Sequence, residues 1–304
     1  MMTSNVPGRL PIGDGISRAV SFLLAHFQPL FDRIAWFVDG LTNALQLGLL
    51  WLPPWLVTAG LVLLALWRVG LGLASFTAVA FALVVSLGLW QETMATLALV
   101  LASTLLSLLI GLPLGIWAAR RDWVDRALRP VLDLMQTMPA FVYLIPAAMF
   151  FGLGRVPGAI ATIIFSMPPA VRLTNLGIRQ VPKEMVEAGL AFGATRRQLL
   201  FKVQIPQAMP SIMAGINQNI MLALSMVVIA SMIGAGGLGN SVLRGIQRLD
   251  VGLGFEGGIG VVLLAIVLDR ITQSFGAGPR ESLRTRFATL FKSAPHPQEK
   301  EEAS

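Results

Sequence analysis

Residues 93–119 read TMATLALVLASTLLSLLIGLPLGIWAA and contain no Asp, Glu, Lys or Arg. Because the hydrocarbon core of a bilayer is about 30 Å thick, roughly 20 apolar helical residues suffice to cross it. This stretch therefore predicts a membrane-spanning helix. Six other stretches support the same prediction, with 156–171 the shortest and rich in proline: 40–67, 69–91, 134–154, 156–171, 208–233 and 257–276. Pro53 and Pro54 indicate that the first of these spans is kinked or starts later. We predict an all-α membrane protein with about seven transmembrane helices, within a range of six to eight.

The composition points to the same class of protein. Of the 304 residues, 55% are hydrophobic and 13% are charged, and the mean hydropathy is +0.72. A soluble fold of this length could not cover itself with polar side chains, and a disordered chain would be poorer in apolar residues. The net charge of +7 is therefore interpreted as a signal of membrane orientation, not as a surface for nucleic acid.

Several kinds of chemistry are excluded by residue type. The sequence has no Cys and only two His, so a thiolate metal site is impossible and a histidine cluster or catalytic triad would depend on His26. It lacks the Gly-x-x-x-x-Gly-Lys-Ser/Thr phosphate loop, so ATP cannot bind in that manner. Gly234, Gly236 and Gly239 match a dinucleotide pattern, but they follow a membrane helix and not a strand, which favours a loop. We expect no enzymatic activity, no cofactor and no metal.

The positive residues alternate between the two sides of the membrane. One set of connections carries most of the Arg and Lys, in segments 120–129, 172–202 and 280–292, together with Arg68. The opposite connections carry Arg155, Arg244 and Arg248, besides three Arg of the N-terminal tail. Since the positive side of a membrane protein is cytoplasmic, we expect the N-terminus outside and the C-terminus inside a bacterial inner membrane.

Three regions follow from these assignments. Residues 1–39 are predicted to be an extracytoplasmic tail. It contains an amphipathic helix that is interrupted near Pro29 and lies either at the membrane surface or against the spans. Residues 40–276 are predicted to be the transmembrane domain. Residues 277–304 are predicted to be a cytoplasmic tail.

The most informative connection is the long cytoplasmic segment 180–206. A helix starting after Pro182 is expected to end near Gly193 and Thr195, and a second helix over about 195–203 is expected to stop at Pro206. Such a protruding pair of short helices can offer a helix to the groove of a partner. A loop folded onto its own membrane domain is the alternative interpretation.

The spacing in this segment resembles a family signature. Permease subunits of binding-protein-dependent ABC importers carry Glu-Ala-Ala, three residues, Gly, nine residues and Ile-x-Leu-Pro. This sequence has Glu187-Ala188-Gly189, three residues, Gly193, nine residues and Val203-Gln204-Ile205-Pro206. The spacing matches in full. The three departures, Gly189, Val203 and Ile205, replace small by small and aliphatic by aliphatic residues.

Other segments are similar to the glycine betaine/proline branch of that family, so that the resemblance spans about 40–276: 136–144, 168–174, 221–233, 236–239 and 242–246. It implies a type I ABC importer permease, working as a homodimer with an ATPase subunit and an extracytoplasmic solute-binding protein. The implied cargo is glycine betaine, proline, choline or a related osmolyte. It also implies that Glu187, Ala188, Gly189, Gly193 and Pro206 belong to the segment that couples to the ATPase.

Two aromatic residues are weaker candidates for the substrate path. Phe141 and Tyr143 lie in the predicted fourth span, and aromatic faces attract quaternary ammonium cations. Ordinary helix packing is the alternative explanation for both. A secondary transporter or channel remains the rival function, although no ionisable residue falls at the middle of a predicted span, as proton coupling would require.

Overall fold

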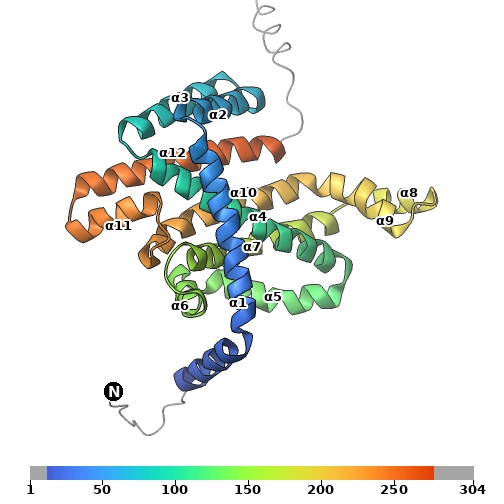
Figure 1. The fold of residues 1–304 in the computed structure, drawn as a ribbon. Helices are drawn as coiled ribbons and strands as arrows, with labels where there is room; N and C mark the ends of the chain where they lie inside the picture. The colour runs from blue at the N-terminus through green and yellow to red at the C-terminus, as the bar shows by residue number, and fades with distance from the viewer. Residues whose placement is uncertain (1–11, 277–304) are drawn as a thin grey trace, which may run out of the picture.

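The computed structural model describes residues 12–276, and all regular secondary structure in this range is helical (Figure 1). The helices are α1 Ile12–Trp51, α2 Pro54–Arg68, α3 Leu71–Ser86, α4 Trp90–Arg120, α5 Asp122–Thr137, α6 Ala140–Phe151, α7 Arg155–Arg179, α8 Lys183–Ala191, α9 Arg196–Leu199, α10 Ile205–Ala230, α11 Leu238–Arg248 and α12 Val251–Gly276. A π-helical turn, η1 Leu200–Gln204, precedes α10, and a 3-10 turn, η2 Ser231–Ile233, follows it. The predicted C-terminal tail 277–304 lies outside the described residues.

The number of membrane-spanning units agrees with the lower end of the prediction. Four helices are long and apolar enough to cross a bilayer: α4, α7, the continuous stretch Arg196–Ile233, and α12. Two bent pairs, α1 with α2 and α5 with α6, bring the number to six if each pair is one span. The helix α3 is apolar but has only 16 residues. The predicted all-α membrane fold is confirmed.

The predicted span 134–154 is wrong as a single helix, and the kink that Pro53 and Pro54 predict in 40–67 is present. The stretches 40–67 and 134–154 each contain a turn of 101°, which lies next to Pro53 in the first and next to Pro139 in the second. Proline lacks an N–H and disfavours the helical conformation of the residue before it, so a helix ends there. Pro29, by contrast, lies inside α1, and the interruption predicted there is also wrong. α1 passes the predicted boundary at residues 39–40 without a break.

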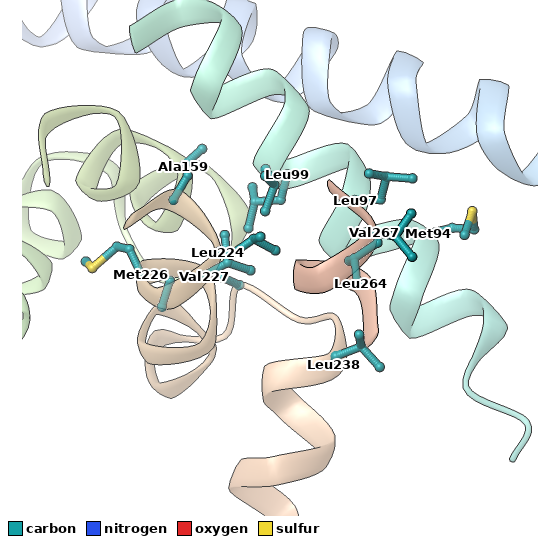
Figure 2. Packing of buried hydrophobic residues seen from close by; sticks show 14 of the residues in the cluster. Met94, Leu97, Leu99, Ala159, Leu224, Met226, Val227, Leu238, Leu264 and Val267 are labelled. Carbon is teal, nitrogen blue, oxygen red and sulfur yellow. The ribbon is translucent and has the colours of Figure 1, made fainter. Parts of the chain in front are cut away.

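The core is formed where α4, α7 and α10 pack together, with α12 against α10. Side chains from α4, α10, α11 and α12 meet in one apolar cluster, which Figure 2 shows: Met94, Leu97, Leu99, Leu224, Met226, Val227, Leu238, Leu264 and Val267. Small residues let these helices approach closely. A Cβ atom built on Gly115 of α4 would lie 2.7 Å from the Val171 carbonyl oxygen of α7, so only glycine fits.

The molecule has two opposite ends, at which the termini of different helices contact one another. At one end, the Gly154 N–H donates to the Ile233 carbonyl over 2.8 Å, and the Leu238 N–H donates to Thr96 Oγ1 over 2.8 Å. We call this the glycine-loop end, after residues 234–237. The opposite end carries α8 and α9 and is called the hairpin end (Figure 1). The ends of α4 and α7 meet there, because Arg179 Nη2 donates to the Ala118 carbonyl over 2.7 Å. Two opposite ends agree with the predicted alternation of connections that are rich in Arg and Lys with connections that are poor in them.

Candidate functional site

The segment 180–206 forms a helical hairpin, as its sequence predicts. α8 begins directly after Pro182 and ends before a turn that contains Gly193. Thr195 caps the start of α9, because its hydroxyl accepts from the Gln198 N–H while the Gln198 side chain accepts from the Thr195 N–H. This reciprocal capping box fixes the start of the second helix. The Thr-x-x-Gln spacing in the sequence is a signal for this capping box.

Two glycines set the geometry of the hairpin. Gly193 has a φ of +77° and no atom within 4 Å of a hypothetical Cβ, so its requirement for glycine comes from the backbone alone. Position 189 requires a small residue because of its neighbours, and not because of its backbone conformation. A Cβ at this position would lie 2.8 Å from Leu199 Cδ1, because α8 packs closely against α9 there. Gly189 therefore packs inside the hairpin.

The hairpin projects from the body of the molecule. α8 has no buried residue, and Phe192 at its end is 92% exposed. Glu187 and Ala188 are exposed as well. The apolar side of the second helix holds the hairpin in place, because Leu199 and Leu200 are buried.

The predicted stop at Pro206 is wrong. The chain runs from α9 through the π turn into α10 without a break, and Pro206 lies in the first turn of α10, exposed. Pro206 lies just after the π turn, where the helical hydrogen-bond pattern has already changed. The Ile205 N–H donates to the Leu200 carbonyl, five residues back, which is the pattern of a π turn. The hairpin is thereby joined rigidly to a long helix of the core.

A cavity of about 730 Å³ lies under the hairpin, between it and the ends of α4 and α7. Its apolar lining includes Trp117 and Leu199, and Glu187 contributes a carboxylate. Five cationic side chains also line it: Arg120, Arg121, Arg179, Lys183 and Arg196. The hairpin end thus presents a strongly basic surface.

A network of charged side chains ties α5 to α7 beside this cavity. Asp125 is 6% exposed and accepts from Arg129 at 2.6 Å and from Asn175 at 2.7 Å. Arg179 donates to Asp122 at 2.8 Å. Arg172 also pairs with Asp133. Asp125 and Arg129 stand at the i,i+4 spacing of helical ion pairs, which is a signal of this contact in the sequence.

A second polar contact lies inside the core. Asn219 of α10 is fully buried, and its Nδ2 donates to Ser107 Oγ of α4 at 2.6 Å and to the Ser166 carbonyl of α7 at 2.7 Å. It thus links the three central helices at one point. An Asn within an apolar helix is a recognisable signal for such a contact.

The two aromatic candidates differ in their surroundings. Tyr143 is 8% exposed, donates to the Met135 carbonyl at 2.5 Å across the bend between α5 and α6, and packs against Phe165. Phe141 is 52% exposed on α6. The two side chains do not form one site. The described residues also contain no group of three His, Asp or Glu that could hold a metal ion.

Comparison with known proteins extends this description. The family described as binding-protein-dependent transport system inner membrane component matches residues 111–280. The glycine betaine/proline betaine transport system permease protein ProW of Escherichia coli is 50% identical over 281 residues, which cover 92% of this chain and 79% of the relative. The glycine betaine transport system permease protein OpuAB of Bacillus subtilis is 50% identical, covering 88% of this chain and 94% of the relative.

One more relative and one solved structure are also similar to this chain. The glycine betaine/carnitine transport permease protein GbuB of Listeria monocytogenes is 51% identical over 275 residues, which cover 89% of this chain and 97% of the relative. Among solved structures, a chain of the MetNI methionine ABC transporter in an inward-facing conformation superposes with a TM-score of 0.52. It is 21% identical and covers 59% of this chain and 92% of that chain. At this identity the match supports the type I ABC importer permease fold and no more.

Proposed function

Because this chain belongs to the family of binding-protein-dependent transport system inner membrane components, we propose that it carries glycine betaine or a related osmolyte through the membrane. It is a multi-pass inner membrane protein and the non-catalytic permease of an ABC importer. The binding protein and the ATPase are separate chains. The observation that supports coupling to an ATPase is the projecting hairpin with the Glu187–Gly193 spacing, joined rigidly to the core helix α10.

The substrate class follows from the relatives. ProW is named for glycine betaine and proline betaine, OpuAB for glycine betaine, and GbuB for glycine betaine and carnitine. Each of these compounds carries a quaternary ammonium group and a carboxylate. We assign this chain a solute of the same chemistry, with choline and proline as the outer limits of the class.

The hairpin is the proposed contact for the ATPase. Its exposed surface offers Glu187, Ala188 and Phe192 to a partner, while Gly189 and Gly193 hold the two helices at their angle. Pro206 marks the junction through which a movement of the hairpin would reach α10. An amphipathic helix seated in a partner's groove is a common mode of recognition between proteins.

A second copy of this chain is the proposed partner within the membrane. α10 exposes residues at helical spacing, among them Gln207, Ala214, Gln218 and Ser225. Polar side chains on an exposed face of a membrane helix are costly against lipid and suit a water-filled path. Phe141 of α6 is exposed as well and is assigned to this path. Tyr143 is assigned the role of holding the α5–α6 bend.

We assign the hairpin end to the cytoplasm, because it carries most of the positive side chains. The glycine-loop end then faces outward, where a solute-binding protein docks. The N-terminal part of α1 lies outside, and the tail 277–304 lies inside. Residues 40–276 form the permease domain, with α1 extending it toward the N-terminus.

Deletion of the chain tests the function. Cells without it are expected to lose the uptake of radiolabelled glycine betaine that depends on a binding protein, and a plasmid copy restores it. Uptake that survives deletion, or that a protonophore abolishes while cellular ATP is maintained, contradicts an ATP-driven permease for this solute and favours the secondary transporter.

A further inference from the structure

A small polar cavity opens at the glycine-loop end, on the side proposed to face outward. Its volume is about 260 Å³, below the roughly 300–1,000 Å³ that is typical of sites for drug-sized ligands. It lies between the starts of α4 and α7, the loop before α11 and the side of α1. Its polar lining consists of Gln46, Gln91, Glu92, Arg155 and Asn240.

The two charged side chains in this cavity have no partner among the described residues. Glu92 and Arg155 are each half-buried, and neither forms an ion pair or a side-chain hydrogen bond with any residue in 12–276. The hairpin end behaves differently, because Asp122, Asp125 and Asp133 are all paired with arginines there. A carboxylate and a guanidinium that line one cavity without pairing leave both charges available to a ligand.

The glycine loop, residues 234–237, forms one wall of the cavity. Gly236 and Gly237 have φ values of +82° and +71° and line the cavity without side chains. The loop lies tightly on α4, since a Cβ atom on Gly237 would lie 2.4 Å from Thr96 Oγ1. The Leu238 N–H donates to the same oxygen, which fixes the loop on α4. The wall is therefore built by backbone that larger residues could not replace without strain.

We propose that this cavity is a transient subsite for the zwitterionic solute, in which Glu92 attracts the quaternary ammonium group and Arg155 binds the carboxylate. The inference rests on the proposed function and locates its cargo on the outer face of the permease. The amides of Gln46, Gln91 and Asn240 supply further hydrogen bonds. No aromatic residue lines the cavity, so it lacks the cation–π attraction that makes quaternary ammonium sites tight. Weak retention suits a site that must pass its cargo on.

The rival explanation is that the same charges dock the binding protein. The test uses the complete transporter in proteoliposomes, with glycine betaine loaded on its binding protein. In Glu92→Gln and Arg155→Gln, uptake at saturating binding protein should fall about tenfold, while the half-saturating concentration of binding protein changes less than twofold. Arg155→Lys keeps the charge and should lose no more than about threefold. Asp39→Asn and Arg248→Gln, exposed charges outside the cavity, should match the wild type.

A charge exchange gives an independent test. In Glu92→Arg combined with Arg155→Glu, a small solute can turn around in the cavity, so uptake should recover to at least half of the wild-type rate. A docking surface with fixed partner charges would be worsened by the exchange. A raised half-saturating concentration with normal maximal uptake, or no effect of either neutralisation, would overturn the subsite. A wild-type complex that takes up no glycine betaine would instead overturn the proposed substrate.

Discussion

Leu199 of α9 lies so close to Gly189 of α8 that a Cβ atom on the glycine would be 2.8 Å from Leu199 Cδ1. The two helices of the hairpin are therefore packed on each other before any partner binds. The group that would be crowded is the flexible end of a leucine, which can move by a few tenths of an ångström. The hairpin is a preformed unit whose outer face is free for a partner.

This packing predicts a graded response at position 189. Gly189→Ala should be accepted after a small movement of Leu199, with glycine betaine uptake within about twofold of the wild type. Gly189→Phe should push the helices apart and abolish copurification of the ATPase. Pull-down from membranes with equal permease abundance measures both effects. Equal ATPase recovery with Gly189→Phe would show that the angle of the hairpin does not matter.

Gly193 gives a prediction based on backbone strain alone. Its φ of +77° costs a β-branched residue about 1–3 kcal/mol, whereas Asn tolerates this region better. Gly193→Val should insert normally into the membrane but lose ATPase association and uptake. Gly193→Asn is the matched control and should keep most of both. Since nothing lies within 4 Å of the hypothetical Cβ, a clash of that atom with another part of the protein does not explain the difference. Wild-type uptake by Gly193→Val would contradict the coupling role.

The buried Asn219 should contribute to stability. Hydrogen bonds between membrane helices are worth on average about 0.6 kcal/mol and at most about 2 kcal/mol each. Asn219→Ala removes two such bonds, and we expect a loss of about 1–3 kcal/mol, measured as a lower unfolding temperature in detergent. Gln218→Ala, on the exposed face of the same helix, is the control for stability. An unchanged unfolding temperature for Asn219→Ala would mean that the contact is energetically neutral.

The orientation can be tested with single cysteines, because the native chain has none. Gln247 at the end of α11 and Gln198 in the hairpin are both exposed. Gln247→Cys should react with an impermeant maleimide in intact cells, and Gln198→Cys should react only after permeabilisation. Ser241 would be a poor probe, since it is 4% exposed. The reverse pattern of labelling would invert the proposed topology.

The sequence predicted the helical class and the hairpin, because both depend on local patterns. Apolar stretches between charged connections mark membrane helices, and the spacing from Pro182 to Gly193 marks the ends of α8. Pro53 and Pro54 also predicted the kink in the first span. The bend at Pro139 was missed, because uninterrupted apolar sequence was given more weight than a proline. The continuous helix through Pro206 was missed because the proline was given more weight than the apolar sequence around it. There a π turn lies just before the proline, and the helix continues past it.

The polar contacts between helices could not be predicted from the sequence, for a physical reason. The pairing of Asn175 with Asp125 and of Asn219 with Ser107 joins residues far apart in sequence, and only the packing of α4, α5, α7 and α10 brings them together. Local periodicity carries no information about such partners. The cavity between Glu92 and Arg155 has the same origin, since its lining comes from four helices and a loop.

The central claim is that this chain is the permease of an ATP-driven importer coupled through the α8–α9 hairpin. The most direct measurement is uptake of radiolabelled glycine betaine into proteoliposomes that contain the chain and its ATPase, with loaded binding protein outside and ATP inside. We expect uptake that requires ATP, is blocked by vanadate, and is lost in Gly193→Val but retained in Gly193→Asn. Uptake that proceeds without ATP or the ATPase, or that is equal in both variants, would contradict it.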